Sequence, residues 1–87
     1  MSLMTKFKIF LARELGFEFE FKVLVASPGN NPYFASMVGL PNPKAEMVIL
    51  ADENNSPKIV VFDHMLINGN VFQFDSTKGR TTIRIIE

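Results

Sequence analysis

The only histidine of the chain, His64, directly follows Asp63, and an imidazole beside a carboxylate is a common basis of general acid–base catalysis. Adjacent residues of a strand point to opposite faces of a sheet, so Asp63 cannot orient His64 if both lie in one strand. With one histidine and no cysteine, the sequence offers neither a catalytic thiol nor a ligand set for a transition metal. We therefore expect no catalytic residue, no metal site and no cofactor, and a small enzyme with a pocket near His64 is the least favoured hypothesis.

Glu18 and Glu20 would share one face of a strand, with Cα atoms about 7 Å apart. A general acid and its partner base need surroundings that separate their two pKa values. Lys22 continues the same polar row, which indicates a solvated face. These carboxylates are therefore interpreted as surface groups.

Three cations near the C-terminus, Lys78, Arg80 and Arg84, could contact phosphates. Small barrels bind single-stranded nucleic acid where a basic groove lies beside aromatic side chains on which bases stack. The formal net charge is zero, however, and nonspecific phosphate binding depends on clustered cations. A nucleic-acid-binding barrel is therefore the alternative hypothesis and not the preferred one.

The apolar content favours association with another protein surface. Of the 87 residues, 47% are hydrophobic and nine are Phe, whereas a domain of this size buries only about 60% of the surface of its unfolded chain. The remaining apolar surface predicts a binding or assembly module that forms a homo-oligomer, with a dimer favoured. The candidate interface residues are Phe10, Leu24, Tyr33, Phe34 and Met37.

The N-terminal segment fits two different elements. Alternation over 5–13 and 17–25 predicts a β-hairpin with a three-residue loop that ends at Gly16, and this hairpin would place Phe10 and Leu24 on its outer face. The alternative is a helix over 3–15, with Ser2 as its N-cap and Gly16 after its last turn. The hairpin is preferred, and the helix would change the class to α+β.

Residues 27–46 contain four of the five prolines and should form a long connection. Within it, 33–38 lacks such breakers, and Asn31 followed by Pro32 resembles a helix start. We expect one short helix there.

The second half should be a meander of strands. The runs 46–51 and 58–62 are almost wholly apolar, which is typical of strands covered on both faces. Asn68 and Gly69 predict a tight hairpin turn, and a loop over 76–79 would place Asp75 opposite Arg80 and Phe72 opposite Ile83. The predicted fold is mainly β: a small antiparallel barrel-like or curved sheet of about six strands.

One domain should span 1–87, with 1–3 added ahead of a natural start at Met4. No apolar run approaches the roughly 20 residues of a membrane span. No basic segment followed by an apolar one marks a secretory signal. We therefore expect a soluble, cytoplasmic protein without a membrane partner.

Overall fold

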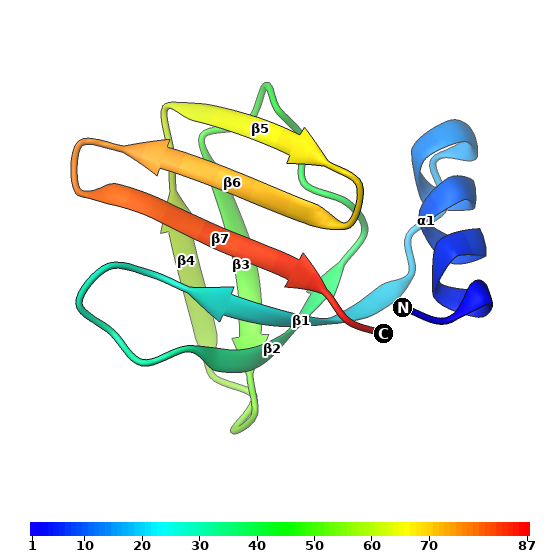
Figure 1. Cartoon of the computed structure of the whole chain (residues 1–87), viewed down its shortest axis with the longest axis horizontal. Coiled ribbons are helices and arrows are strands. Elements are labelled where there is room, and N and C mark those ends of the chain that lie inside the picture. The colour runs from blue at the N-terminus through cyan, green and yellow to red at the C-terminus, as the bar shows by residue number, and fades with distance from the viewer.

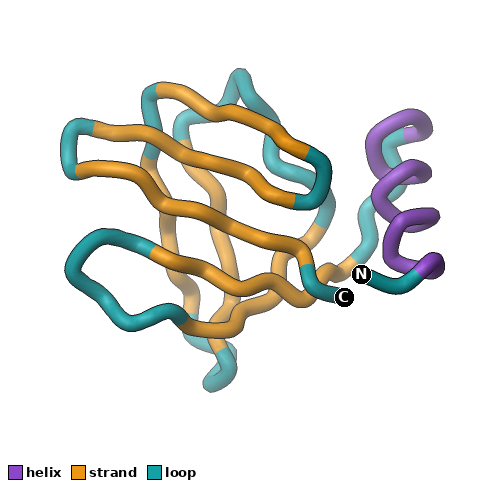
Figure 2. Tube along the Cα trace, in the orientation of Figure 1, coloured by secondary structure: helices purple, strands orange, loops and turns teal.

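Seven antiparallel strands and one N-terminal helix make up the structure, a computed structural model that describes residues 1–87 (Figures 1 and 2). The mainly β class is confirmed, with one strand more than the expected six. The elements in chain order are α1 (Leu3–Leu15), β1 (Glu20–Ala26), β2 (Tyr33–Val38), β3 (Met47–Asp52), β4 (Pro57–Val61), β5 (His64–Asn68), β6 (Val71–Ser76) and β7 (Gly79–Ile85).

The sheet is a meander that curls into a half-barrel. Its strand order is β4-β3-β2-β1-β7-β6-β5, so all consecutive strands pair except β4 and β5, and the first strand also pairs with the last. The strands β5, β6, β7 and β1 cross in front of β3 and β4 (Figure 1). The two edge strands are thus neighbours in the chain, joined by the two-residue link Phe62–Asp63.

Alternate residues of the strands fill the interior, as expected where one face of a sheet is buried. The most completely buried side chains come from the central strands and β6, and each is at most 1% exposed: Phe21, Val23, Val25, Phe72, Phe74, Ile83 and Ile85. The core therefore consists of aromatic and branched side chains from strands far apart in the sequence.

The N-terminal segment is a helix, so the preferred hairpin over 5–25 is wrong and the alternative is right. The Ser2 hydroxyl accepts a hydrogen bond from the Thr5 backbone N–H at 3.1 Å, and Gly16 ends the helix with a positive φ of 76°. The hairpin fails for a tertiary reason: β1 already pairs with β2 on one edge and with β7 on the other. No edge of β1 remains for an N-terminal strand.

Helix α1 lies beside one end of the barrel (Figure 1). Thr5 and Ile9 are its only buried residues, and Ala12 packs partly against the core. Arg13 adds a long hydrogen bond of 3.5 Å from its guanidinium to the Gly69 carbonyl in the β5–β6 turn. The helix is 13 residues long, and no helix of the chain is long and apolar enough to cross a membrane.

The short helix expected within 27–46 is also wrong, because Tyr33–Val38 is strand β2. Six residue pairs join it to β1, from Glu20 opposite Val38 to Val25 opposite Tyr33. Ala35 and Met37 point into the core. Pro32 therefore precedes a strand, where its missing N–H costs no ladder hydrogen bond.

The predicted registers of the last hairpin are confirmed: Asp75 lies opposite Arg80, and Phe72 lies opposite Ile83. The β5–β6 turn is shifted by one residue, because Asn68 pairs with Val71 and the two loop residues are Gly69 and Asn70. Gly69 takes the positive φ of 62° at the first loop position. The Asn70 side-chain amide donates to the Ile85 carbonyl at 2.8 Å, which fixes the turn against β7.

Candidate functional site

Helix α1 presents most of its large apolar side chains to solvent. At 100° per residue, Leu3 and Phe7 lie opposite Thr5 and Ile9, and the other three (Met4, Phe10 and Leu15) lie on the two flanks, about 100–120° from the midpoint of Thr5 and Ile9. We call them the helix stripe; its members and their exposed fractions are Leu3 (83%), Met4 (65%), Phe7 (56%), Phe10 (54%) and Leu15 (65%). The helix is amphipathic, but its larger apolar side faces away from the barrel.

A second apolar surface covers the outside of β3 and β4. Met47 lies opposite Val61, and Ile49 lies opposite Ile59, so all four side chains point to the same side of the hairpin. Together with Val38 of β2 they form what we call the sheet face, whose members are 47–66% exposed. The runs 46–51 and 58–62 were expected to be covered on both faces, and the structure covers only the inner one.

The sheet face contains a shallow groove of about 390 Å³. Val38 and Ile49 supply apolar walls, and Glu20 of β1 places a carboxylate at one border. Glu18, two residues before Glu20, lies beside Gly39, which follows β2: a Cβ added at Gly39 would be 3.6 Å from Cγ of Glu18. The groove therefore has a mixed apolar and polar lining, with the Glu20 carboxylate on its β1 side.

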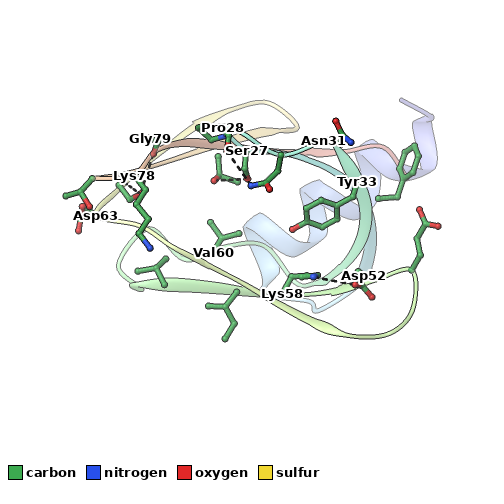
Figure 3. Close-up of a pocket in the computed structure, with 18 of the residues that line it drawn as sticks. Ser27, Pro28, Asn31, Tyr33, Asp52, Lys58, Val60, Asp63, Lys78 and Gly79 are labelled. Carbon is green, nitrogen blue, oxygen red and sulfur yellow. Dashed lines mark hydrogen bonds and ion pairs between the residues drawn. The ribbon is translucent and has the colours of Figure 1, made fainter.

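The end of the barrel away from α1 is a polar hollow of about 1070 Å³, which we call the mouth (Figure 3). The β1–β2 loop, the β3–β4 turn and the β6–β7 turn meet there. The Tyr33 hydroxyl points into the hollow, and the Lys78 side chain extends toward Val60 across it (Figure 3). On the wall, the hydroxyls of Ser27 and Thr81 lie 3.2 Å apart.

Tyr33 and Asp52 both line the mouth, and the carboxylate affects the ionisation of the phenol. Burial raises the pKa of Tyr33, and the negative charge of Asp52 raises it further. The Asp52 carboxylate also shapes the β3–β4 turn, since it accepts the backbone N–H groups of Asn54 and Ser56, each at 2.9 Å. Lys58 Nζ lies 3.8 Å from its other oxygen. The Asp52 carboxylate therefore stabilises the β3–β4 turn.

The predicted interface residues occupy four separate places. Phe10 belongs to the helix stripe, whereas Leu24 and Phe34 face each other on the outer side of β1 and β2. Tyr33 lines the mouth. Met37 is 2% exposed in the core, so it offers no surface to a partner. Phe10 and Leu24 do not share the surface of one hairpin, because Phe10 is helical.

The three cations proposed for nucleic acid are also dispersed. Lys78 borders the mouth, while Arg84 lies on β7 opposite Leu24 of β1. Arg80 is held by Asp75, with Nε 2.7 Å from one carboxylate oxygen and Nη2 3.2 Å from the other. The structure thus brings together no basic groove from these residues.

His64 is exposed at the start of β5, opposite Asp75. The Asp75 carboxylate is bound by Arg80. The long connection and the second-half strands do form a hollow, the mouth, but His64 does not line it. No group of three or more His, Asp or Glu side chains could hold a metal ion.

The sheet face was missed from the sequence although its signal was present. Nearly unbroken apolar runs indicate a strand with no solvated side. The sequence does not show whether the second cover comes from the same chain. In the structure, both runs leave their outer face exposed to solvent.

Comparisons with known proteins identify no relatives: no family model, no curated protein and no solved structure matches the chain.

Proposed function

We propose that this protein is an assembly module that self-associates through the helix stripe of α1. The observation that carries the proposal is the direction of the helix: its larger apolar side points to solvent. Soluble monomers rarely expose a contiguous apolar patch of this kind unless it binds a partner.

The energetics of the helix support this proposal. An isolated helix of 13 residues is marginal in water, so α1 depends on packing for its stability. Within the chain that packing is thin, because only Thr5 and Ile9 are buried. Burial of a large apolar side chain contributes about 1.5–3 kcal/mol. A partner that covers two or three stripe residues would therefore stabilise the helix and the assembly together.

The test is the mass of the protein in solution, measured by sedimentation equilibrium over a wide range of concentration. The wild-type chain should show a concentration-dependent mass. Phe10→Glu should weaken association at least about tenfold, which corresponds to about 1.4 kcal/mol. Leu66→Glu is the matched control, because Leu66 is 45% exposed against 54% for Phe10 and lies on the edge strand β5, outside the helix stripe.

A wild-type chain that stays monomeric at every concentration would overturn the proposal. An equal loss of association in both variants would also contradict it, because the effect would then come from added charge and not from the stripe. Circular dichroism of each variant checks that the fold is retained.

A further inference from the structure

We infer that the helix stripe of one copy docks on the sheet face of a second copy, and that the contact is reciprocal, which gives a twofold dimer. This inference rests on the proposed self-association and names its partner surface. Each copy would contribute one helix and one sheet face, so both of its bare apolar surfaces would be covered.

The two surfaces are of complementary kinds. A helix with one apolar stripe and a sheet with one apolar face commonly cover each other in folded domains. In this chain each surface lacks its counterpart: the helix stripe has no sheet over it, and the outer side of β3 and β4 has no helix over it. A second copy supplies both missing surfaces.

Their dimensions also agree. A helix of 13 residues is about 20 Å long, at 1.5 Å per residue. Strands of six and five residues extend about 16–20 Å, at 3.3 Å per residue. The helix can therefore lie along the sheet face with little overhang, and the groove between Val38 and Ile49 provides a hollow for its side chains.

Charge favours the sheet face over a second helix as the partner. Three basic residues, Lys6, Lys8 and Arg13, flank the stripe, and its one acidic residue, Glu14, lies within it in the last turn of the helix. Two such helices placed side by side would repel each other. The sheet face instead has Glu18 and Glu20 along its β1 side.

The next outward residue of β1, Lys22, carries the opposite charge. Its amino group lies 4.0 Å from the Glu87 carboxylate, which offsets that charge. The acidic border beside the groove is therefore retained.

The absence of cysteine allows a direct test by disulfide trapping. Phe10→Cys places a thiol near the middle of the helix, and Ile49→Cys places one near the middle of β3. A pair of central positions meets in either direction of docking. Leu66→Cys is the control, because Leu66 is 45% exposed on the edge strand β5, outside both surfaces.

We expect a mixture of the Phe10→Cys and Ile49→Cys chains to form a cross-linked dimer under mild oxidation. The Phe10→Cys chain alone, or mixed with the Leu66→Cys chain, should form at least about tenfold less cross-linked dimer. Cross-linking of Phe10→Cys with itself would overturn the inference and show a helix-to-helix contact, while the proposed self-association would stand. If the wild-type chain dimerises but the Phe10→Cys and Ile49→Cys chains do not cross-link, the docking surface is likewise rejected and the proposed self-association stands.

A monomeric wild-type chain would reject both proposals. A lipid surface is the other candidate partner of a basic amphipathic helix, and binding to vesicles of equal parts phosphatidylcholine and phosphatidylserine tests it. Binding of the monomer to these vesicles, with loss of binding in Phe10→Glu, would assign the helix stripe to a lipid surface. Dimerisation without vesicle binding is the expected result.

Discussion

Phe62 packs against Phe74 with ring centroids 4.9 Å apart and ring planes inclined at 61°. Phe62 lies in the two-residue link between β4 and β5, where neighbouring strands do not pair, and Phe74 lies in β6. The two side chains are 3% and 1% exposed. Between β4 and β5 the curled sheet has no ladder of hydrogen bonds, and there this ring packing adds to two backbone hydrogen bonds, from Phe62 to the Glu46 carbonyl (3.0 Å) and from Asp63 to the Asp75 carbonyl (2.8 Å).

Phe62→Ala should lower the free energy of unfolding by about 3–5 kcal/mol, because it removes a buried aromatic ring and leaves a cavity. The measurement is urea unfolding of the wild-type and variant chains, followed by circular dichroism. Phe34→Ala is the control, since an exposed side chain should change stability by only about 0.5 kcal/mol. Equal effects of the two substitutions would show that Phe62 does not hold the link.

Gly79→Ala should destabilise the β6–β7 turn by about 1–3 kcal/mol. Gly79 has a φ of 120°, and an added Cβ would lie 2.9 Å from Cγ of Pro28 in the β1–β2 loop. Adding Pro28→Ala to the Gly79→Ala variant should restore the part of the loss that comes from this clash. If the double variant is no more stable than Gly79→Ala, the loss comes from backbone strain alone. Urea unfolding measures the stability of the single and the double variant.

The pair formed by Arg80 and Asp75 should make stability depend on acid pH. The hydrogen bond from Arg80 lowers the pKa of Asp75 below its ordinary value, so the charged pair stabilises the folded state above about pH 4. This stabilisation is lost as the pH falls through the lowered pKa. The difference in urea midpoint between the wild-type chain and Asp75→Asn should therefore be largest near neutral pH and vanish in strong acid.

Variants of two arginines on β7 separate this pair from general charge effects. Arg80→Gln should move the pKa of Asp75, followed by carboxyl NMR, upward toward its ordinary value. Arg84→Gln removes the same charge from the same strand without touching Asp75 and should leave that pKa unchanged. Similar shifts in both variants would mean that the arginines act only through bulk charge.

Tyr33 is the only tyrosine and the chain has no tryptophan, so the absorbance of its phenolate reports one group. Its ionisation midpoint should lie above about 10, chiefly because burial disfavours the charged form. Since its folded pKa exceeds the unfolded one, stability should decline as the pH rises through this range. The same titration in urea should return the ordinary midpoint, and identical midpoints would refute the prediction.

Asp52→Asn tests the smaller cause of that shift. The variant keeps an oxygen that can accept the turn hydrogen bonds but removes the negative charge. The midpoint of Tyr33 should therefore fall partway toward its ordinary value. Glu53→Gln, the adjacent control, should leave it in place.

Local chemistry explains what could be predicted from the sequence. The loop over 76–79 sets the register of β6 and β7, so Asp75 opposite Arg80 followed from the letters alone. The β5–β6 turn was located correctly but displaced by one residue, because Asn68–Gly69 and Gly69–Asn70 both suit tight turns. These features depend on residues that are adjacent in the sequence, so local preferences are enough to predict them.

The N-terminal element was decided by tertiary structure. Phe7, Ile9 and Leu11 alternate as in a strand, while Phe7 and Phe10 also fit a helical face, so periodicity alone supports both. The decisive fact is that β7 occupies the second edge of β1, with Val23 opposite Ile85. That pairing joins opposite ends of the chain, and local patterns carry no information about it.

The two exposed apolar surfaces likewise depend partly on the sequence and partly on the tertiary structure. The sequence by itself determined that apolar surface exceeds what 87 residues can enclose, since the small interior of such a chain limits burial. Only the tertiary structure decided where the excess lies: on the helix stripe, because α1 contacts the barrel through Thr5 and Ile9, and on the sheet face, because no element covers the outside of β3 and β4. The composition sets the amount of apolar surface, whereas long-range strand pairing fixes which side of each element the core covers.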